Sequence, residues 1–127
     1  MAIPTGSGTE VLRRGAVIIQ STDVTSFKFD GANPDTGTET YAVPANHIIT
    51  IISIIICEAA GNAETFSMSI DDGTNPYVKL LEQQALAAKA TFVWNDKFSL
   101  IGGDKIKVWA TAGDVDIYYS YLDQDFS

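Results

Sequence analysis

Apolar and polar positions alternate along much of the chain and predict a series of short strands. Alternation with a period of two places one face of a strand in a core and the other toward solvent. Clusters of turn-forming residues separate these segments, for example at 102–104 and 112–114. The clearest alternating sets are Phe66, Met68 and Ile70, then Ile106, Val108 and Ala110, then Val115, Ile117, Tyr119 and Tyr121.

About eight or nine such strands, with no sustained helical period, predict an all-β fold, an antiparallel β-sandwich of jelly-roll-like form. Segment 80–90 is rich in helix formers and is compatible with one helical turn or with an extended connection. The 127 residues suffice for one domain with its own core, which we place at 11–127. Residues 1–10 are small, polar and Gly-rich, so we expect a flexible, extended N-terminal arm.

The most apolar stretch of the chain, HIITIISIIIC at 47–57, contains seven isoleucines. It is about half the length that a helix needs to cross a bilayer, and β-branched residues favour strands. Counted by twos, both faces are apolar, with Ile49, Ile51 and Ile55 on one of them. An antiparallel sandwich normally leaves one face of each sheet in water. We therefore expect a second copy of the protein to cover the face of this strand that does not pack in the protein's own core, because closed symmetric homo-oligomers are common.

The net charge of −8 and the pI near 4.3 argue against partners that carry phosphate groups. Lys and Arg are scattered apart from the pair Arg13 and Arg14, whereas nucleic acids and anionic membranes require clustered cations. The single cysteine, Cys57, excludes a disulfide framework and predicts a small buried apolar residue. The first residues lack a basic segment followed by an apolar one, so we expect no secretory signal and synthesis in the cytoplasm.

Residues with reactive or ligating side chains do not form a catalytic or metal-binding pattern. His47 is the only histidine, and turn chemistry explains the Asp71 and Asp72 pair better than a calcium loop does. We predict no catalytic residue, no metal and no cofactor. Trp109 alternates with the apolar residues of its strand and points away from them, toward solvent as a sugar-binding residue or toward a second subunit.

The residues that we predict to form an interface are of three kinds. The N-terminal arm could become ordered by adding a strand to a neighbouring protein. The arginine pair is the one cationic cluster in the sequence. The apolar side chains of the isoleucine strand and of the tryptophan are expected to be covered by another subunit. The predicted interface residues are Ile3, Pro4, Thr5, Arg13, Arg14, Ile49, Ile51, Ile55 and Trp109.

Several segments taken together resemble small virion structural proteins of tailed bacteriophages. They are Val-Pro-Ala-Asn-His at 43–47, Phe-Ser-Met-Ser-Ile-Asp-Asp-Gly at 66–73, Phe-Val-Trp-Asn at 92–95, Gly-Gly-Asp-Lys-Ile-Lys-Val-Trp-Ala at 102–110 and Val-Asp-Ile-Tyr-Tyr-Ser-Tyr at 115–121. The start, Ala-Ile-Pro-Thr-Gly-Ser-Gly-Thr-Glu at 2–10, is similar to such proteins in marine phages.

The resemblance implies a non-enzymatic capsid decoration or cement protein on the virion surface, made in the host cytoplasm and often a homotrimer. Its partners would be copies of itself and the major capsid protein. Two alternatives stay open: a structural module of a tail fibre or baseplate, and a carbohydrate-binding module that would use Trp109 or Tyr77.

Overall fold

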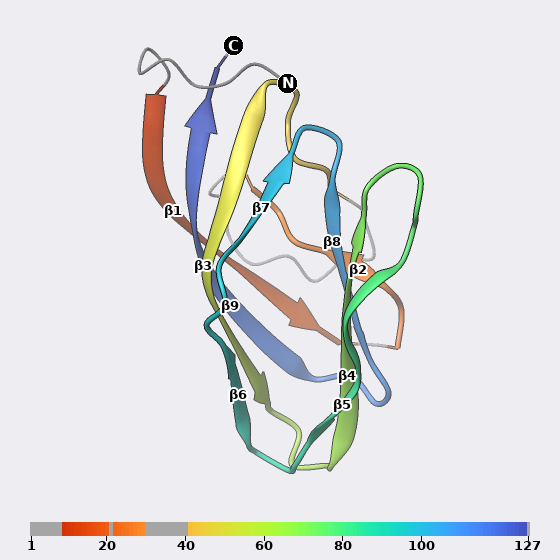
Figure 1. Cartoon of the computed structure of the whole chain (residues 1–127). Helices are drawn as coiled ribbons and strands as arrows, with labels where there is room; N and C mark the ends of the chain where they lie inside the picture. The colour runs from red at the N-terminus through yellow and green to blue at the C-terminus, as the bar shows by residue number, and fades with distance from the viewer. Residues whose placement is uncertain (1–8, 21, 30–40, 127) are drawn as a thin grey trace.

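The computed structural model describes residues 9–20, 22–29 and 41–126, which form nine strands in two layers (Figure 1). The strands are β1 (Thr9–Ile19), β2 (Thr25–Ser26), β3 (His47–Glu58), β4 (Glu64–Asp71), β5 (Val78–Leu86), β6 (Thr91–Trp94), β7 (Phe98–Ile101), β8 (Lys105–Ala110) and β9 (Val115–Asp125). One layer is a five-stranded sheet in the order β1-β9-β3-β6, with β7 also paired to β3. The other is a four-stranded sheet in the order β2-β8-β4-β5.

The strands pair as a set of nested antiparallel hairpins. β4 pairs with β5, β3 with β6 and β7, β2 with β8, and β1 with β9. Successive pairs alternate between the two sheets, which is the topology of a jelly roll. The prediction of an all-β antiparallel sandwich with about eight or nine strands is confirmed.

The core lies between the two sheets and is built from the inward positions of the long strands. On β9, Val115, Ile117, Tyr119 and Tyr121 are buried at alternate positions, as their spacing predicts. Phe66, Met68, Ile106 and Val108 come from the facing sheet. The two sheets bury these side chains against each other, and this apolar burial is the main stabilising contribution to the fold.

A β-bulge in β3 overturns the expectation that Ile49, Ile51 and Ile55 share one face of the strand. The pairing of β3 with β9 shifts by one residue between Ile51 and Ser53. Ile49 and Ile51 before the shift, and Ile54 and Ile56 after it, therefore point to the same side, where all four are completely buried. The predicted interface role of Ile49 and Ile51 is wrong for that reason, since they are core residues.

Tyr119 on β9 requires a glycine on the neighbouring strand. Gly15 lies opposite Tyr119, and a Cβ atom at this glycine would come within 2.3 Å of the tyrosine ring. The ring stacks on Phe27 with 4.2 Å between centroids, and its hydroxyl donates a hydrogen bond to the carbonyl of Lys28. The close approach of the two strands here thus requires a residue without a side chain.

Other boundaries differ from expectation. β1 begins at Thr9 and so includes two residues that were assigned to the arm, while residues 1–8 lie outside the described part of the chain. Segment 78–86 is a strand, β5, and extends the four-stranded sheet. Cys57 is only partly buried, because the bulge places it on the outer side of β3.

Candidate interaction surface

The outer face of the five-stranded sheet, which we call the outer face below, is apolar across four neighbouring strands. Ile55 at its centre lies directly opposite Tyr118 on β9 and Val93 on β6, and Tyr118 lies opposite Ala16 on β1. Side chains of directly opposed residues contact each other on one side of a sheet. These four residues therefore form one continuous row across the sheet.

Exposed apolar side chains gather on this face. Seven large apolar side chains are exposed in the described residues, and five of them lie here: Leu12, Ile55, Val93, Ile101 and Tyr118. Leu12 is the most exposed, at 69%. Isolated exposed apolar residues are common on protein surfaces, whereas a contiguous group on one face marks an interaction site.

A groove of about 470 Å³ runs across this face between β1, β9 and β3. It is lined by Leu12, Arg13, Arg14, Ile52, Tyr118 and Ser120. Arg14 reaches over it and donates a weak hydrogen bond to the hydroxyl of Tyr118, with 3.4 Å between Nη1 and Oη. The groove thus has apolar walls and one cation that is available to a partner.

The predicted interface residues separate into different environments. Arg14 and Ile55 lie on the outer face, with Ile55 41% exposed. Arg13 points to the inner side of the same strand, where its Nε lies 3.3 Å from Asp123 Oδ2. Trp109 lies on the other sheet, and Ile3, Pro4 and Thr5 fall in residues 1–8, outside the described chain. Sequence reasoning missed Leu12, Val93 and Tyr118.

Trp109 points away from the core, as its alternation predicts, and packs against Tyr77. The two rings are edge to face with 5.7 Å between centroids. Lys79 Nζ lies 4.9 Å from the centroid of the Trp109 ring, and Lys107 Nζ lies 4.6 Å from that of Tyr77. Ammonium groups therefore cover ring faces on which a sugar would stack.

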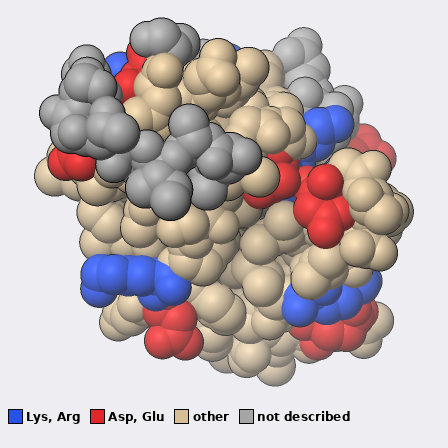
Figure 2. Space-filling model, turned by 45° about the horizontal axis from the view of Figure 1, so that its top comes forward, with Lys and Arg blue, Asp and Glu red and all other residues tan. Residues whose placement is uncertain are grey.

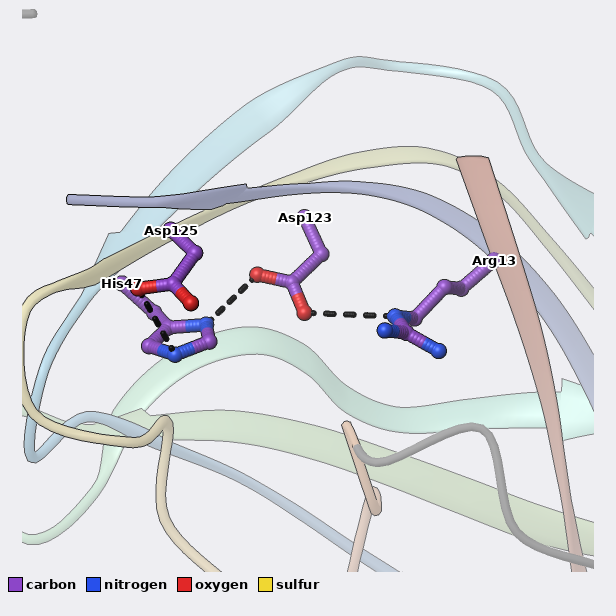
Figure 3. Close-up of polar contacts among 4 residues, drawn as sticks. All are labelled: Arg13, His47, Asp123 and Asp125. Carbon is purple, nitrogen blue, oxygen red and sulfur yellow. Dashed lines mark hydrogen bonds and ion pairs between the residues drawn. The ribbon is translucent and has the colours of Figure 1, made fainter. Parts of the chain in front are cut away.

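A charged cluster closes one end of the sandwich between three strands of the five-stranded sheet (Figure 3). His47 Nδ1 lies 2.7 Å from Asp123 Oδ1, and its Nε2 lies 3.5 Å from Asp125 Oδ1. Asp123, which is almost fully buried, also pairs with Arg13. Both ring nitrogens face carboxylates, and with the Arg13–Asp123 ion pair these polar contacts join β1, β9 and β3.

A pocket of about 630 Å³ lies beside this cluster. It is lined mainly by apolar and backbone groups: Val43, Ala45, Asn46, His47, Ile48, Ile101, Gly102, Gly103 and Phe126. Within the described ranges, no group of three or more His, Cys, Asp or Glu residues is placed to hold a metal ion.

The opposite end of β3 carries a buried carboxylate that organises two turns. Glu58 accepts hydrogen bonds from the backbone N–H groups of Ala60, Gly61 and Lys89 at 2.8–3.0 Å. These bonds, first of all the one from Lys89, hold the pKa of Glu58 below its ordinary value although burial acts in the other direction. Nearby, burial raises the pKa of Glu64, and the charge of Glu58 adds to that rise.

The acidic turn after β4 is explained by turn chemistry. Asp71 Oδ1 accepts a hydrogen bond from the backbone N–H of Gly73, and Asp72 Oδ1 accepts bonds from those of Thr74 and Asn75. These bonds to backbone N–H groups lower the pKa of both aspartates. The carboxylates thus stabilise their own loop, as Asp does in turns generally.

Charges on the face shown in Figure 2 are dispersed. In the view of Figure 2, positive and negative side chains lie in small, mixed groups with wide uncharged areas between them. No helix in the described structure is long and apolar enough to cross a membrane.

Similarity to known proteins adds no argument about what this chain does. No protein-family model matches the chain, and no curated protein sequence is significantly similar to it. Among solved structures, the chain is similar to the globular domain of zebrafish complement 1qA protein, with a TM-score of 0.48 and 9% identity. That likeness covers 90% of this chain and 94% of the other. A similarity at this level carries no functional conclusion.

Proposed function

We propose that the chain is a non-enzymatic structural protein of a phage particle, a capsid decoration protein whose outer face binds the major capsid protein. One observation carries the proposal: five of the seven exposed large apolar side chains in the described residues lie on this single face. A monomer in solution gains no stability from exposed apolar side chains, whereas a protein that binds to a surface buries them in the contact.

The character of the face suits a large and repetitive partner. Its described charged residues are Glu10 and Arg14 on the edge strand and Asp116 at the far end of β9, so the centre is uncharged. Apolar centres with a polar rim are typical of stable protein interfaces. On a lattice, many such contacts act together, so a modest affinity per subunit gives high occupancy.

The identity of the partner rests on the resemblance to small virion proteins of tailed phages. Jelly rolls also build viral capsid and lectin domains, so the fold is compatible with this role without selecting it. If the chain were a tail-fibre or baseplate module, the same face would bind a tail protein. A carbohydrate-binding role receives less support, because Lys79 and Lys107 cover faces of the aromatic rings that would hold a sugar.

Co-sedimentation with purified phage heads and tails tests this proposal. We expect the protein to pellet in a saturable manner with expanded heads of the phage that encodes it, and to stay in solution with isolated tails. Ile55→Asp should weaken head binding at least about ten-fold, since removing a central apolar contact costs about 1–2 kcal/mol or more. Val78→Asp is the matched control, because Val78 is equally exposed, at 42%, on the other sheet.

Three outcomes would contradict the proposal. Binding to tails and not to heads would favour the tail module. Binding to glycans that is lost in Trp109→Ala would favour the carbohydrate-binding module. Equal loss of head binding in Ile55→Asp and Val78→Asp would show that the outer face is not the docking surface.

A further inference from the structure

β1 differs from the other sheet edges in being long and regular. Exposed edge strands offer unpaired N–H and C=O groups to other chains, and proteins usually blunt them with short strands, bulges or breaks. Here β2 has only two residues, and the edge formed by β6 and β7 is split into two strands of four. β5 pairs with β4 through two register shifts, and Gln83 within it has a φ of 52°.

In contrast, β1 pairs with β9 in unbroken register over all eleven residues, and it lies at one side of its layer (Figure 1). In the described structure no strand pairs with its other side. Within the described residues, its outer edge therefore offers a regular row of backbone N–H and C=O groups to which a further strand can add.

We propose that two copies of the protein pair through β1, antiparallel, about a two-fold axis at Leu12. In this arrangement Leu12 of one copy lies opposite Leu12 of the other. Glu10 of each copy then lies opposite Arg14 of the other, on the same face. The two five-stranded sheets become one continuous sheet, and this contact does not depend on what the outer face binds.

Charge selects this register over its neighbours. A two-fold axis at Glu10, Arg13 or Arg14 would place like charges directly opposite each other, which destabilises a strand pair. An axis at Val11 or Gly15 leaves both arginines opposite uncharged residues. A pairing register shifted by one residue would place the outer face of one copy on the same side of the joined sheet as the inner face of the other. The axis at Leu12 forms two complementary ion pairs.

The side chains of β1 fit this pairing. Leu12, the most exposed large apolar residue described, loses its exposure at the centre of the contact. Arg13 lies opposite Val11 of the second copy, and its charge is already balanced by Asp123 within its own subunit. Arg14 and Glu10 are on the outer face, where Arg14 donates a hydrogen bond to Tyr118 and Glu10 accepts one from Gln124, both neutral partners.

Disulfide trapping tests the register in the full chain with Cys57 replaced by serine. Leu12→Cys should form a disulfide-linked dimer on mild oxidation, because directly opposed Cβ atoms are about 4.5–5.5 Å apart. Glu10→Cys and Arg14→Cys should cross-link with each other when mixed, several-fold more than either does with itself. Ile18→Cys is the control, since its two copies would be about 40 Å apart.

Charge exchange tests the same register without cysteines. Glu10→Arg alone should weaken dimerisation about ten-fold or more in sedimentation equilibrium, because it places two arginines opposite each other twice. Arg14→Glu alone should have a similar effect, and the double variant should restore dimerisation.

Either of two results would overturn the pairing. One is Leu12→Cys cross-linking no faster than Ile18→Cys. The other is a native homotrimer in light scattering that the single charge variants leave intact. These readouts need no phage particle, so they separate failure of this contact from failure of the proposed function.

Discussion

Replacing Gly15 with alanine tests how tightly β1 and β9 are packed in the core. The added Cβ would lie 2.3 Å from Cζ, 2.4 Å from Oη and 2.6 Å from Cε2 of Tyr119. Carbon atoms in contact prefer about 3.5–4.0 Å, so the ring or the strand must move by more than about 1 Å. Tyr119 cannot move easily, because it is fully buried and stacks between Phe27 and Tyr121.

Two opposing effects set the size of the change. Overpacking of a core costs about 1–3 kcal/mol, and loss of the hydrogen bond from Tyr119 to the Lys28 carbonyl costs about 1 kcal/mol more. Restricting the unfolded chain by Gly→Ala contributes about 0.4–1 kcal/mol in the stabilising direction. We therefore expect a net loss of about 2 kcal/mol, or about 8 °C in Tm for a domain of this size.

The assay is urea and thermal unfolding followed by circular dichroism, at a protein concentration low enough to keep association constant between variants. In a Tyr119→Leu background, the same Gly15→Ala change should cost at least about 1 kcal/mol less, since the clashing ring atoms are gone. A native-background Gly15→Ala protein with unchanged or raised Tm would refute the reasoning, because it would show that the entropic effect outweighs the contact.

Two further predictions concern β3. Glu58→Gln should destabilise the protein at neutral pH, because an amide accepts the three backbone hydrogen bonds less well. Since folding lowers the pKa of Glu58, its contribution is present above the ordinary value of 4.5 and is lost as the pH falls. The difference in unfolding free energy between native protein and variant should therefore shrink below pH 4.5, and a constant difference would exclude the charge as its cause. Ile51→Ala should cost about 2–5 kcal/mol and Ile55→Ala less than about 1 kcal/mol in urea unfolding, and equal costs would contradict the bulged register.

The local pattern was sufficient to predict the strand content and the inward face of β9. Its apolar residues alternate with polar or exposed ones, so the burial of Val115, Ile117, Tyr119 and Tyr121 follows from the sequence. The prediction for β3 failed because seven of the eleven residues at 47–57 are isoleucine, and nothing in such a run shows where the register shifts. The two faces of β1, with Arg13 inside and Arg14 outside, follow from alternation once the strand is recognised.

The charged cluster and the outer face depend on contacts between distant segments. His47 and Asp123 are 76 positions apart, and a single sequence gives no sign that their strands are neighbours. Likewise Val93, Ile55 and Tyr118 form a row only because β6, β3 and β9 pair in a particular register. Of the three isoleucines predicted to lie at an interface, Ile49 and Ile51 are buried in the core, and Ile55 is exposed, so its interface role stays a prediction.

The position of β9 has a consequence for how the protein is made. β9 is the last described strand to leave the ribosome, yet it lies in the middle of its sheet between β1 and β3. Residue 9 has to wait for residue 125 before it can pair, so the five-stranded layer closes only after β9 has been made. Until then the isoleucines of β3 have no β9 neighbour, so the last strand to be made is the one that covers this edge of β3 while the chain folds.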